Sequence, residues 1–373
     1  MDMRDTLCLC GEGLDGAARG RAKSAAGIGP SKEHFKMTHS ASRMASALGA
    51  ALLLSTLTSA ALAQNADAPR LSLPVKCTLG VDCWVQNLPD FDPTDRARDP
   101  LCGPMSYDTH NGTDIRVATL GDLKRKIPIR AMADGKVTAL RNTADEKLVE
   151  SDADRAAVKD KECGNGVIID HGGGWTTQLC HLAKGSVSVK KGDTVKRGDA
   201  VGMMGMSGLT QFPHVHAVVR KDMNVTDPLT GRKPDEDCSA NDTFANSLFG
   251  ASLAAQLPQA ASALIGSGFT SKPVSSIDIL KGDIPKPSKA GPVVFFAKFI
   301  NVRKGDMIEI DIDGPNGTFL RHRPKPIASN SARWTVYTGR KVRPQPGATY
   351  RADVRLIRDG SVIASTSGID ASF

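Results

Sequence analysis

Short segments with the alternation of β-strands, most of them bounded by glycine, recur between Tyr107 and Val219. They cover residues 127–140, 164–172, 175–182, 192–205 and 214–220. A period of two places successive side chains on opposite faces of a sheet, and glycine permits the turns and bulges between strands. With 36 glycines, 21 prolines and 5% aromatic residues among 373, the chain favours short strands over long helices. We therefore predict a mainly β protein.

A second group of alternating segments fills the C-terminal region. They are residues 293–300, 307–313, 333–339, 349–360 and 361–367. The Asp359-Gly360 pair is typical of a tight hairpin turn, and the density of strands predicts a small β-sandwich-like accessory domain over 291–373. Between the two groups, residues 239–290 combine apolar positions at helical spacing, from Phe244 to Leu257, with a Ser/Gly/Pro-rich run. We expect a helical and linker segment there.

The N-terminal region resembles an export signal followed by a strap. Residues 44–63 form an apolar run that ends in Ala61-Leu62-Ala63, the pattern of a secretory signal peptide. The run is too short and too rich in Ser and Thr for a stable membrane span. We predict that residues 1–63 are an upstream extension and signal peptide, cleaved after Ala63, and that the protein is exported to the periplasm of a Gram-negative bacterium or secreted. Residues 64–105 are expected to form an irregular strap.

Six of the eight cysteines follow the predicted cleavage site, an even number that suggests disulfides in an exported protein. Cys163 and Cys180 flank a glycine turn and would meet across a hairpin. A Cys77–Cys83 bridge would close a small loop and leave Cys102 for Cys238, although other pairings remain open. A cysteine zinc site is disfavoured because no CxxC pair occurs.

Charge narrows the range of partners. The formal net charge is +8, which is compatible with an anionic wall polymer. No dense Lys/Arg run and no basic stretch interleaved with aromatic residues occurs, so we expect no nucleic-acid binding. Residues 142–162 form a charged stretch between strands, which we interpret as a partly helical surface insertion.

Five of the eight histidines lie between His110 and His216. His110 and Asp114 are four residues apart with Gly112 between them, and His214 and His216 are two apart, hence on one face of a strand. Two imidazoles and one carboxylate would leave a fourth zinc position for water, as in catalytic rather than structural sites. Such a water is a nucleophile at neutral pH, so the pattern indicates metal-assisted hydrolysis.

The order of these motifs resembles the lysostaphin/LytM family of zinc peptidases. The resemblance is carried by His110-Asn111-Gly112-Thr113-Asp114, by Cys180-His181-Leu182 and by Pro213-His214-Val215-His216, with a glycine-punctuated run over 187–208. It extends over residues 106–230. It implies an open, twisted antiparallel sheet with a groove for an extended peptide, in a peptidase domain over 106–238.

The resemblance also implies a role for each residue. His110, Asp114 and His216 would bind Zn²⁺, and His181 and His214 would be the catalytic histidines that orient water and stabilise the developing oxyanion. The implied function is an endopeptidase that cuts peptide cross-links between the stems of peptidoglycan. A catalytically inactive member that binds the wall or activates another hydrolase is the alternative, and retention of all five positions favours activity. D-Ala-D-Ala carboxypeptidases space the first His and Asp more widely, which disfavours that class.

Two positions depart from the family pattern. Leu179 replaces a usual tyrosine and Phe212 a usual glycine, and both are expected to alter the shape of the groove rather than remove a ligand. Outside the five site residues, His171 is expected to pack in a turn and His322 to be solvated.

The accessory domain has no motif that identifies a ligand. It is a candidate for a protein or glycan partner. Arg340, Lys341 and Arg343 could contact an anionic polymer or simply form a solvated edge.

Overall fold

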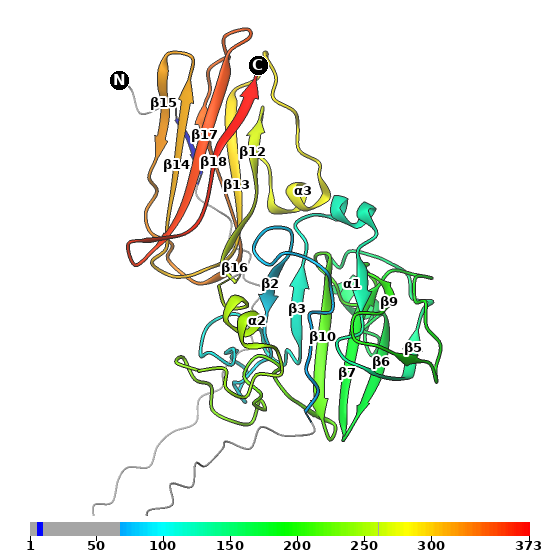
Figure 1. The fold of residues 1–373 in the computed structure, drawn as a ribbon. Helices are drawn as coiled ribbons and strands as arrows, with labels where there is room; N and C mark the ends of the chain where they lie inside the picture. Colours follow the sequence, from blue (N-terminus) through cyan, green and yellow to red (C-terminus); the bar gives the residue numbers. More distant parts are fainter. Residues whose placement is uncertain (1–5, 10–67, 260) are drawn as a thin grey trace, which may run out of the picture. The chain divides into compact units, whose positions relative to one another are not determined.

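The computed structural model describes residues 6–9, 68–259 and 261–373, and it consists mainly of antiparallel strands joined by turns (Figure 1). The described helices are short: α1 (Asp152–Ala157), α2 (Ala251–Gln256), α3 (Ser276–Lys281) and a 3₁₀ helix (Leu120–Arg125). The mainly β prediction is confirmed. None of the helices in these described ranges is long and apolar enough to cross a membrane. The predicted signal peptide at 44–63 lies outside the described residues.

The largest sheet has eight strands and carries the histidine motifs. In spatial order its main path is β2 (Trp84–Asn87), β3 (Thr113–Arg116), β10 (His214–Lys221), β7 (Trp175–Leu182), β6 (Asn165–Gly172), β5 (Gly135–Arg141) and β8 (Thr194–Val195), and β11 (Asn224–Val225) pairs with β10. A separate two-stranded sheet joins β4 (Pro128–Arg130) to β9 (Ala200–Met203). These pairings are antiparallel, as expected for strands joined by short turns.

One face of the large sheet packs on an apolar core. Ile115, Leu179 and Val215 are each at most 1% exposed and belong to one buried cluster. Because side chains alternate along a strand, the neighbours Asp114 and His216 project from the opposite face. Leu179 therefore lies in the core and does not line the face that carries the histidines, which corrects our expectation that it shapes the groove.

The strap over 64–105 is more regular than expected, because it contributes β2 to the large sheet. Val85 and Ile115 face each other in the β2–β3 ladder, and both are buried in the core. The strand has only four residues, Trp-Val-Gln-Asn, which are all buried and do not alternate between apolar and polar, so it did not stand out in the sequence. The strap thereby extends the sheet beside β3.

The C-terminal region forms the predicted sandwich. One sheet contains β1 (Thr6–Leu9), β16 (Ser331–Arg340), β13 (Val293–Val302) and β12 (Ala263–Thr270), and the other β15 (Gly317–His322), β14 (Met307–Gly314), β17 (Thr349–Arg358) and β18 (Ser361–Ser372). Apolar side chains from both sheets, among them Phe295, Phe299, Ile310 and Val354, form one buried cluster. The hairpin at Asp359-Gly360 is confirmed, with positive φ at both residues.

The segment expected to be a helical linker, 239–290, differs from the prediction in two ways. It contains β12, whose Gly266-Ser267-Gly268 run hid the strand alternation. Its helix α2 begins at Ala251 rather than Phe244, because Phe244 has a φ of 56°, a left-handed conformation that an α-helix excludes. Helix in the insertion at 142–162 is confined to α1.

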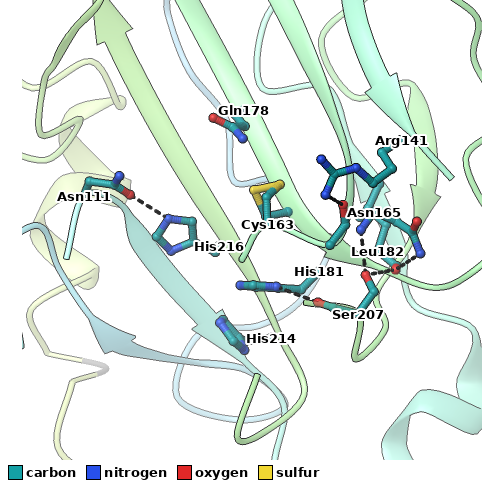
Figure 2. Close-up of a disulfide and its surroundings, with 12 residues drawn as sticks. Asn111, Arg141, Cys163, Asn165, Gln178, His181, Leu182, Ser207, His214 and His216 are labelled. Carbon is teal, nitrogen blue, oxygen red and sulfur yellow. Dashed lines mark hydrogen bonds between the residues drawn. A yellow bond between two sulfur atoms is a disulfide. The ribbon is translucent and has the colours of Figure 1, made fainter. Parts of the chain in front are cut away.

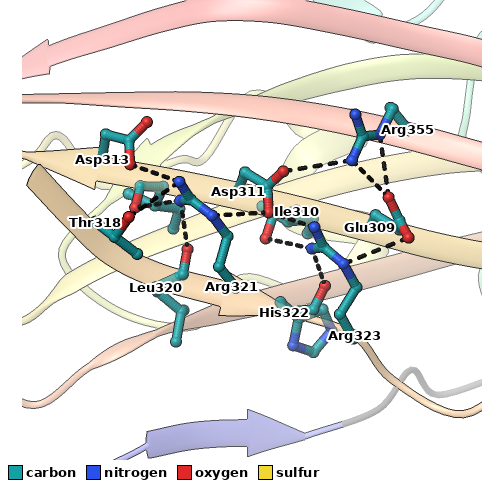
Figure 3. Close-up of polar contacts among 11 residues, drawn as sticks. Glu309, Ile310, Asp311, Asp313, Thr318, Leu320, Arg321, His322, Arg323 and Arg355 are labelled. Carbon is teal, nitrogen blue, oxygen red and sulfur yellow. Dashed lines mark hydrogen bonds and ion pairs between the residues drawn. The ribbon is translucent and has the colours of Figure 1, made fainter.

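His322 is buried, contrary to our expectation that it is solvated. It lies on β15 between Arg321 and Arg323, and alternation directs its ring inward, leaving it 5% exposed. Figure 3 shows the ring on the opposite side of the strand from the two guanidinium groups. Those groups pair with acidic residues of β14, for example Arg323 Nη2 with Asp311 Oδ1 at 2.6 Å. The outer face thus has balanced charges, which suits a solvated sheet surface.

All three suggested disulfides are present. They join Cys77 to Cys83, Cys102 to Cys238 and Cys163 to Cys180. Cysteines in these bridges cannot act as thiolate ligands, which removes the Cys77–Asp82–Cys83 group as a metal site.

Candidate metal centre

Neighbouring strands bring the five predicted site residues together. In the β3–β10 ladder, Asp114 lies opposite His216. In the β7–β10 ladder, Cys180 lies opposite His216, so that His181 follows at the end of β7. His110 enters from the loop before β3. Figure 2 shows His181, His214 and His216 directed toward one another.

Three side chains form a compact ligand set. His110 Nε2 lies 3.2 Å from His216 Nδ1 and 3.2 Å from an Asp114 carboxylate oxygen. His216 Nδ1 lies 2.8 Å from the other oxygen of Asp114. Zinc–ligand bonds of about 2.0–2.2 Å in a tetrahedron place ligand atoms about 3.3 Å apart, so this spacing suits a small divalent cation.

Hydrogen bonds on the far side of each imidazole fix its tautomer. His110 Nδ1 lies 2.7 Å from the Leu88 carbonyl oxygen, and His216 Nε2 lies 3.0 Å from Asn111 Oδ1. Both partners can only accept, so these nitrogens carry the protons. The nitrogens that face each other therefore both present lone pairs, beside a carboxylate. Such a cluster of acceptors is favourable when a cation lies between them, and the residues present fit zinc.

Two contacts that orient the ligands come from the strap and were missed in the sequence. Asn87 Nδ2 donates to Asp114 Oδ2 at 2.8 Å, and Leu88 supplies the carbonyl that accepts from His110. Neither position belongs to a motif. The Trp84–Asn87 run has no polar–apolar alternation, so the strand that carries Asn87 becomes evident only from its pairing with β3.

His181 and His214 are arranged differently from the ligands. His181 Nδ1 donates to the Ser207 carbonyl at 2.9 Å, and His214 Nδ1 donates to the Phe212 carbonyl at 2.8 Å. Each ring thus keeps a lone pair on Nε2, and the two ring centroids are 4.6 Å apart. His214 Nε2 lies 3.6 Å from Asp114 Oδ1, which places it beside the ligand set.

Burial controls the protonation of these two histidines. It lowers the pKa of His181 well below its ordinary value, and the neighbouring His214 and His216 lower that pKa further. Burial also lowers the pKa of His214, although Asp114 opposes the change. Both rings are neutral at pH 7 and can accept a proton.

Backbone conformation places His181 and His216. His181 has a φ of 64°, which is rare for a residue with a Cβ and turns its ring out of the strand alternation. At Gly112, a Cβ would lie 2.7 Å from Cε1 of His216, so only glycine lets the loop pass this ring.

Two aromatic rings border the histidines. Tyr107, which sequence reasoning missed, packs against His110 with a centroid distance of 4.4 Å and rings tilted by 36°. Phe212 packs against His214 at the same centroid distance with the rings tilted by 31°, and the guanidinium of the buried Arg116 lies 4.6 Å from the Phe212 ring centroid. Phe212, one of the two departures from the family pattern, therefore contacts the candidate catalytic residue His214 directly.

His171 lies outside this group. Its Nδ1 is 2.7 Å from the Asp134 carbonyl oxygen and its Nε2 is 2.9 Å from Thr177 Oγ1. Both nitrogens are therefore engaged in packing a turn against a strand, in agreement with the sequence interpretation.

Residues 108–228 match the model of Peptidase family M23. The chain carries an M23 peptidase domain. Two relatives from Vibrio cholerae serotype O1, peptidoglycan DD-endopeptidases ShyA and ShyB, are 33% and 32% identical over 107 residues, which cover 29% of this chain and 19% of each relative. The chain thus spans about a fifth of the length of these curated relatives.

Solved structures of peptidases show a weaker likeness to the chain. A zinc-containing peptidase from Vibrio cholerae has 23% identity, covers 39% of each chain and has a TM-score of 0.25. The catalytic domain of lysostaphin from Staphylococcus simulans has 22% identity, covers 32% of this chain and 77% of its own, and has a TM-score of 0.24. Because these TM-scores are low, the M23 domain is assigned from the family match and the geometry of the site.

Proposed function

We propose that the protein is a zinc-dependent endopeptidase that hydrolyses peptide cross-links of peptidoglycan. The observation that carries the proposal is the ligand set of His110, Asp114 and His216, with mutual spacings of 2.8–3.2 Å, beside two neutral imidazoles. The names of the DD-endopeptidase relatives support peptidoglycan as the substrate.

The metal would be held by His110 Nε2, an Asp114 carboxylate oxygen and His216 Nδ1. When bound, zinc lowers the pKa of a coordinated water to about 7 and polarises a carbonyl. Burial raises the pKa of Asp114, but the neighbouring imidazoles hold that pKa well below its ordinary value, so the carboxylate is negatively charged and suited to bind a cation.

His181 and His214 are proposed to handle the protons of the reaction. Each presents a neutral Nε2, so either ring can take a proton from the attacking water. A ring protonated in this way can stabilise negative charge on the carbonyl oxygen or pass its proton to the leaving amine. The carbonyls of Ser207 and Phe212 keep both rings in the required tautomer.

An exported, oxidising location is part of the proposal. Three disulfides among the described residues support it, because structural disulfides form in the periplasm and outside the cell and are rare in reducing cytosol. Peptidoglycan lies in such a compartment in bacteria.

Defined muropeptide dimers test the function. The purified full chain, loaded with zinc, is expected to convert dimers into monomers, and removal of zinc by a chelator should stop the conversion. Mass spectrometry of the products would identify the bond that is cut.

Two variants complete the test. His216→Ala should abolish cleavage, whereas His171→Ala, which removes an imidazole from the same sheet without touching the ligand set, should retain it. Absence of stoichiometric zinc, or equal cleavage by His216→Ala and the parent, would contradict the enzyme and favour an inactive wall-binding or activating protein.

A further inference from the structure

The Cys163–Cys180 disulfide lies beside the candidate catalytic residues (Figure 2). Cys180 is 2% exposed, lies opposite His216 in the β7–β10 ladder and directly precedes His181. Cys180 therefore lies in β7 between two parts of the site: it pairs with the candidate ligand His216 and directly precedes the proposed catalytic residue His181.

The other end of the bridge controls the backbone of His181. The N–H of His181 donates to the Cys163 carbonyl at 2.9 Å. This bond holds His181 in its left-handed conformation, at a φ of 64°. For a residue with a Cβ, such a conformation is unfavourable and persists only where neighbouring groups hold it.

The segment around Cys163 also supports the loop that orients the ring of His181. Asn165 N–H donates to Ser207 Oγ at 2.8 Å, and Leu209 N–H donates to the Glu162 carbonyl at 2.8 Å. The Ser207 carbonyl accepts from His181 Nδ1 at 2.9 Å. The bridge, the loop and the ring thus form one connected unit.

Close packing makes this unit stiff. A Cβ on Gly164 would lie 2.3 Å from the carbonyl carbon of Ser207, and a Cβ on Gly208 would lie 2.2 Å from the Glu162 oxygen. The two backbones are in direct contact, so displacement of the Cys163 segment must displace the Ser207 carbonyl.

We propose that the Cys163–Cys180 disulfide is a positioning element for His181, with an effect on catalysis beyond cross-linking the domain. The inference rests on the proposed peptidase function. The bridge joins Cys180 in β7 to Cys163, two residues before β6, so it closes only 17 residues beside strands that already pair, whereas Cys102–Cys238 spans 136. Its contribution to chain entropy is correspondingly smaller.

The test compares two double variants of the full chain. Cys163→Ala/Cys180→Ala removes the bridge beside His181, and Cys77→Ala/Cys83→Ala, which removes a bridge of the strap that is not bonded to His181, is the matched control. With zinc bound, the first variant should show a kcat about 10–100-fold below the parent, a KM within about threefold and unchanged zinc content, because small misplacement of a catalytic group lowers the rate of the chemical step. The control should keep the parental kcat.

A double-mutant cycle shows whether the bridge acts through His181. Removing the bridge from a His181→Ala protein should change its residual kcat by less than about twofold, since a positioning element has no effect once its target is absent.

Hydrogen exchange provides a readout that does not depend on activity. The amide of His181 should exchange at least about tenfold faster in Cys163→Ala/Cys180→Ala than in the control. An unchanged kcat and unchanged exchange would overturn the inference. So would loss of zinc or of the fold together with activity, which would make the bridge a general stabiliser. If the zinc-loaded parent cleaves no muropeptide, the proposed function fails instead, while the exchange result still reports on the positioning of His181.

Discussion

At the scale of single residues, each candidate zinc ligand is oriented by one neutral partner. Leu88 and Asn111 accept from the two imidazoles, and Asn87 donates to the carboxylate. Neutral partners fix the direction of a ligand without cancelling the negative charge that attracts the metal. Partners of this kind affect metal affinity strongly although they never touch the ion.

The contact from Asn87 gives a direct prediction. Asn87→Ala removes the donor to Asp114 Oδ2, and we expect zinc affinity to fall about 10–100-fold with little change in the fold. Competition with a chromophoric chelator measures the dissociation constant. Asn241→Ala, at an exposed asparagine, is the control. Equal affinities for the two variants would contradict the role assigned to Asn87.

Lys298 gives a prediction about stability. Its side chain is 2% exposed, and its Nζ donates to the Ser276 carbonyl at 3.0 Å. Burial, with smaller contributions from Arg116 and Arg333, lowers the pKa of Lys298 from 10.5 to about 7. Between those values, the unfolded chain binds a proton that the folded chain does not. The free energy of unfolding therefore rises with pH between about 7 and 10.5. Below pH 7 the folded chain must bury a charged ammonium group, so the whole destabilisation applies.

Replacement of Lys298 by methionine should remove this penalty. We expect Lys298→Met to raise the free energy of unfolding by about 1–4 kcal/mol at pH 7 and by less at pH 9, because burying an uncharged chain avoids desolvation of an ammonium group. Urea unfolding at both pH values checks this, with the exposed Lys341→Met as control. An equal effect at the two pH values would be inconsistent with a titrating Lys298.

At the scale of elements, one asparagine joins the edge of the peptidase sheet to the sandwich. Asn301, in β13, donates from Nδ2 to the carbonyls of Gln86 and Ala261, each at 3.0 Å, and its Oδ1 accepts from Gln86 Nε2 at 3.0 Å. Gln86 Oε1 in turn accepts from Arg116 at 2.8 Å. This buried chain of hydrogen bonds connects β13 to β2 and β3, two strands from which the candidate metal site is built.

Loss of the Asn301 side chain should loosen this connection. Asn301→Ala is expected to lower the free energy of unfolding by about 2–4 kcal/mol, because buried carbonyls lose their donor. Asn301 has a φ of 51°, so Asn301→Gly should lose about 1 kcal/mol less, since glycine adopts this conformation without strain. Denaturant unfolding of both variants measures the difference, and an alanine variant at least as stable as the glycine variant would show that backbone strain is unimportant here.

At the scale of the whole molecule, metal binding should be coupled to stability. The ligands come from a loop and two strands that are about a hundred residues apart in sequence, and only the folded chain brings them together. Free zinc at about 100 times its dissociation constant should therefore add about 2.7 kcal/mol to the free energy of unfolding.

Calorimetry can test this coupling. Zinc should raise Tm, a chelator should reverse the rise, and His110→Ala should show no zinc-dependent change. A similar rise in His110→Ala would place the bound metal elsewhere.

Local patterns in the sequence predicted most of the strands and the hairpin at Asp359-Gly360, and they singled out five residues that the structure brings together. These features depend on neighbours within a few positions: side-chain alternation, backbone freedom at glycine, and the spacing of His and Asp in short motifs. The burial of other side chains depended on how segments that are distant in sequence pair and pack. His322 is buried because its strand forms one layer of a sandwich, and Leu179 belongs to the core because of the face on which its strand packs.

The sequence by itself thus determined the predominance of β structure and indicated the candidate ligand set, because side-chain alternation and the spacing of His and Asp are local features. Only the tertiary structure decided which groups orient the ligands. Asn87 and Leu88 reach the site because β2 pairs with β3, and the Cys163 bridge supports His181 because two loops pack in backbone contact. Such contacts arise from long-range pairing and close packing, which leave no periodic signal along the chain.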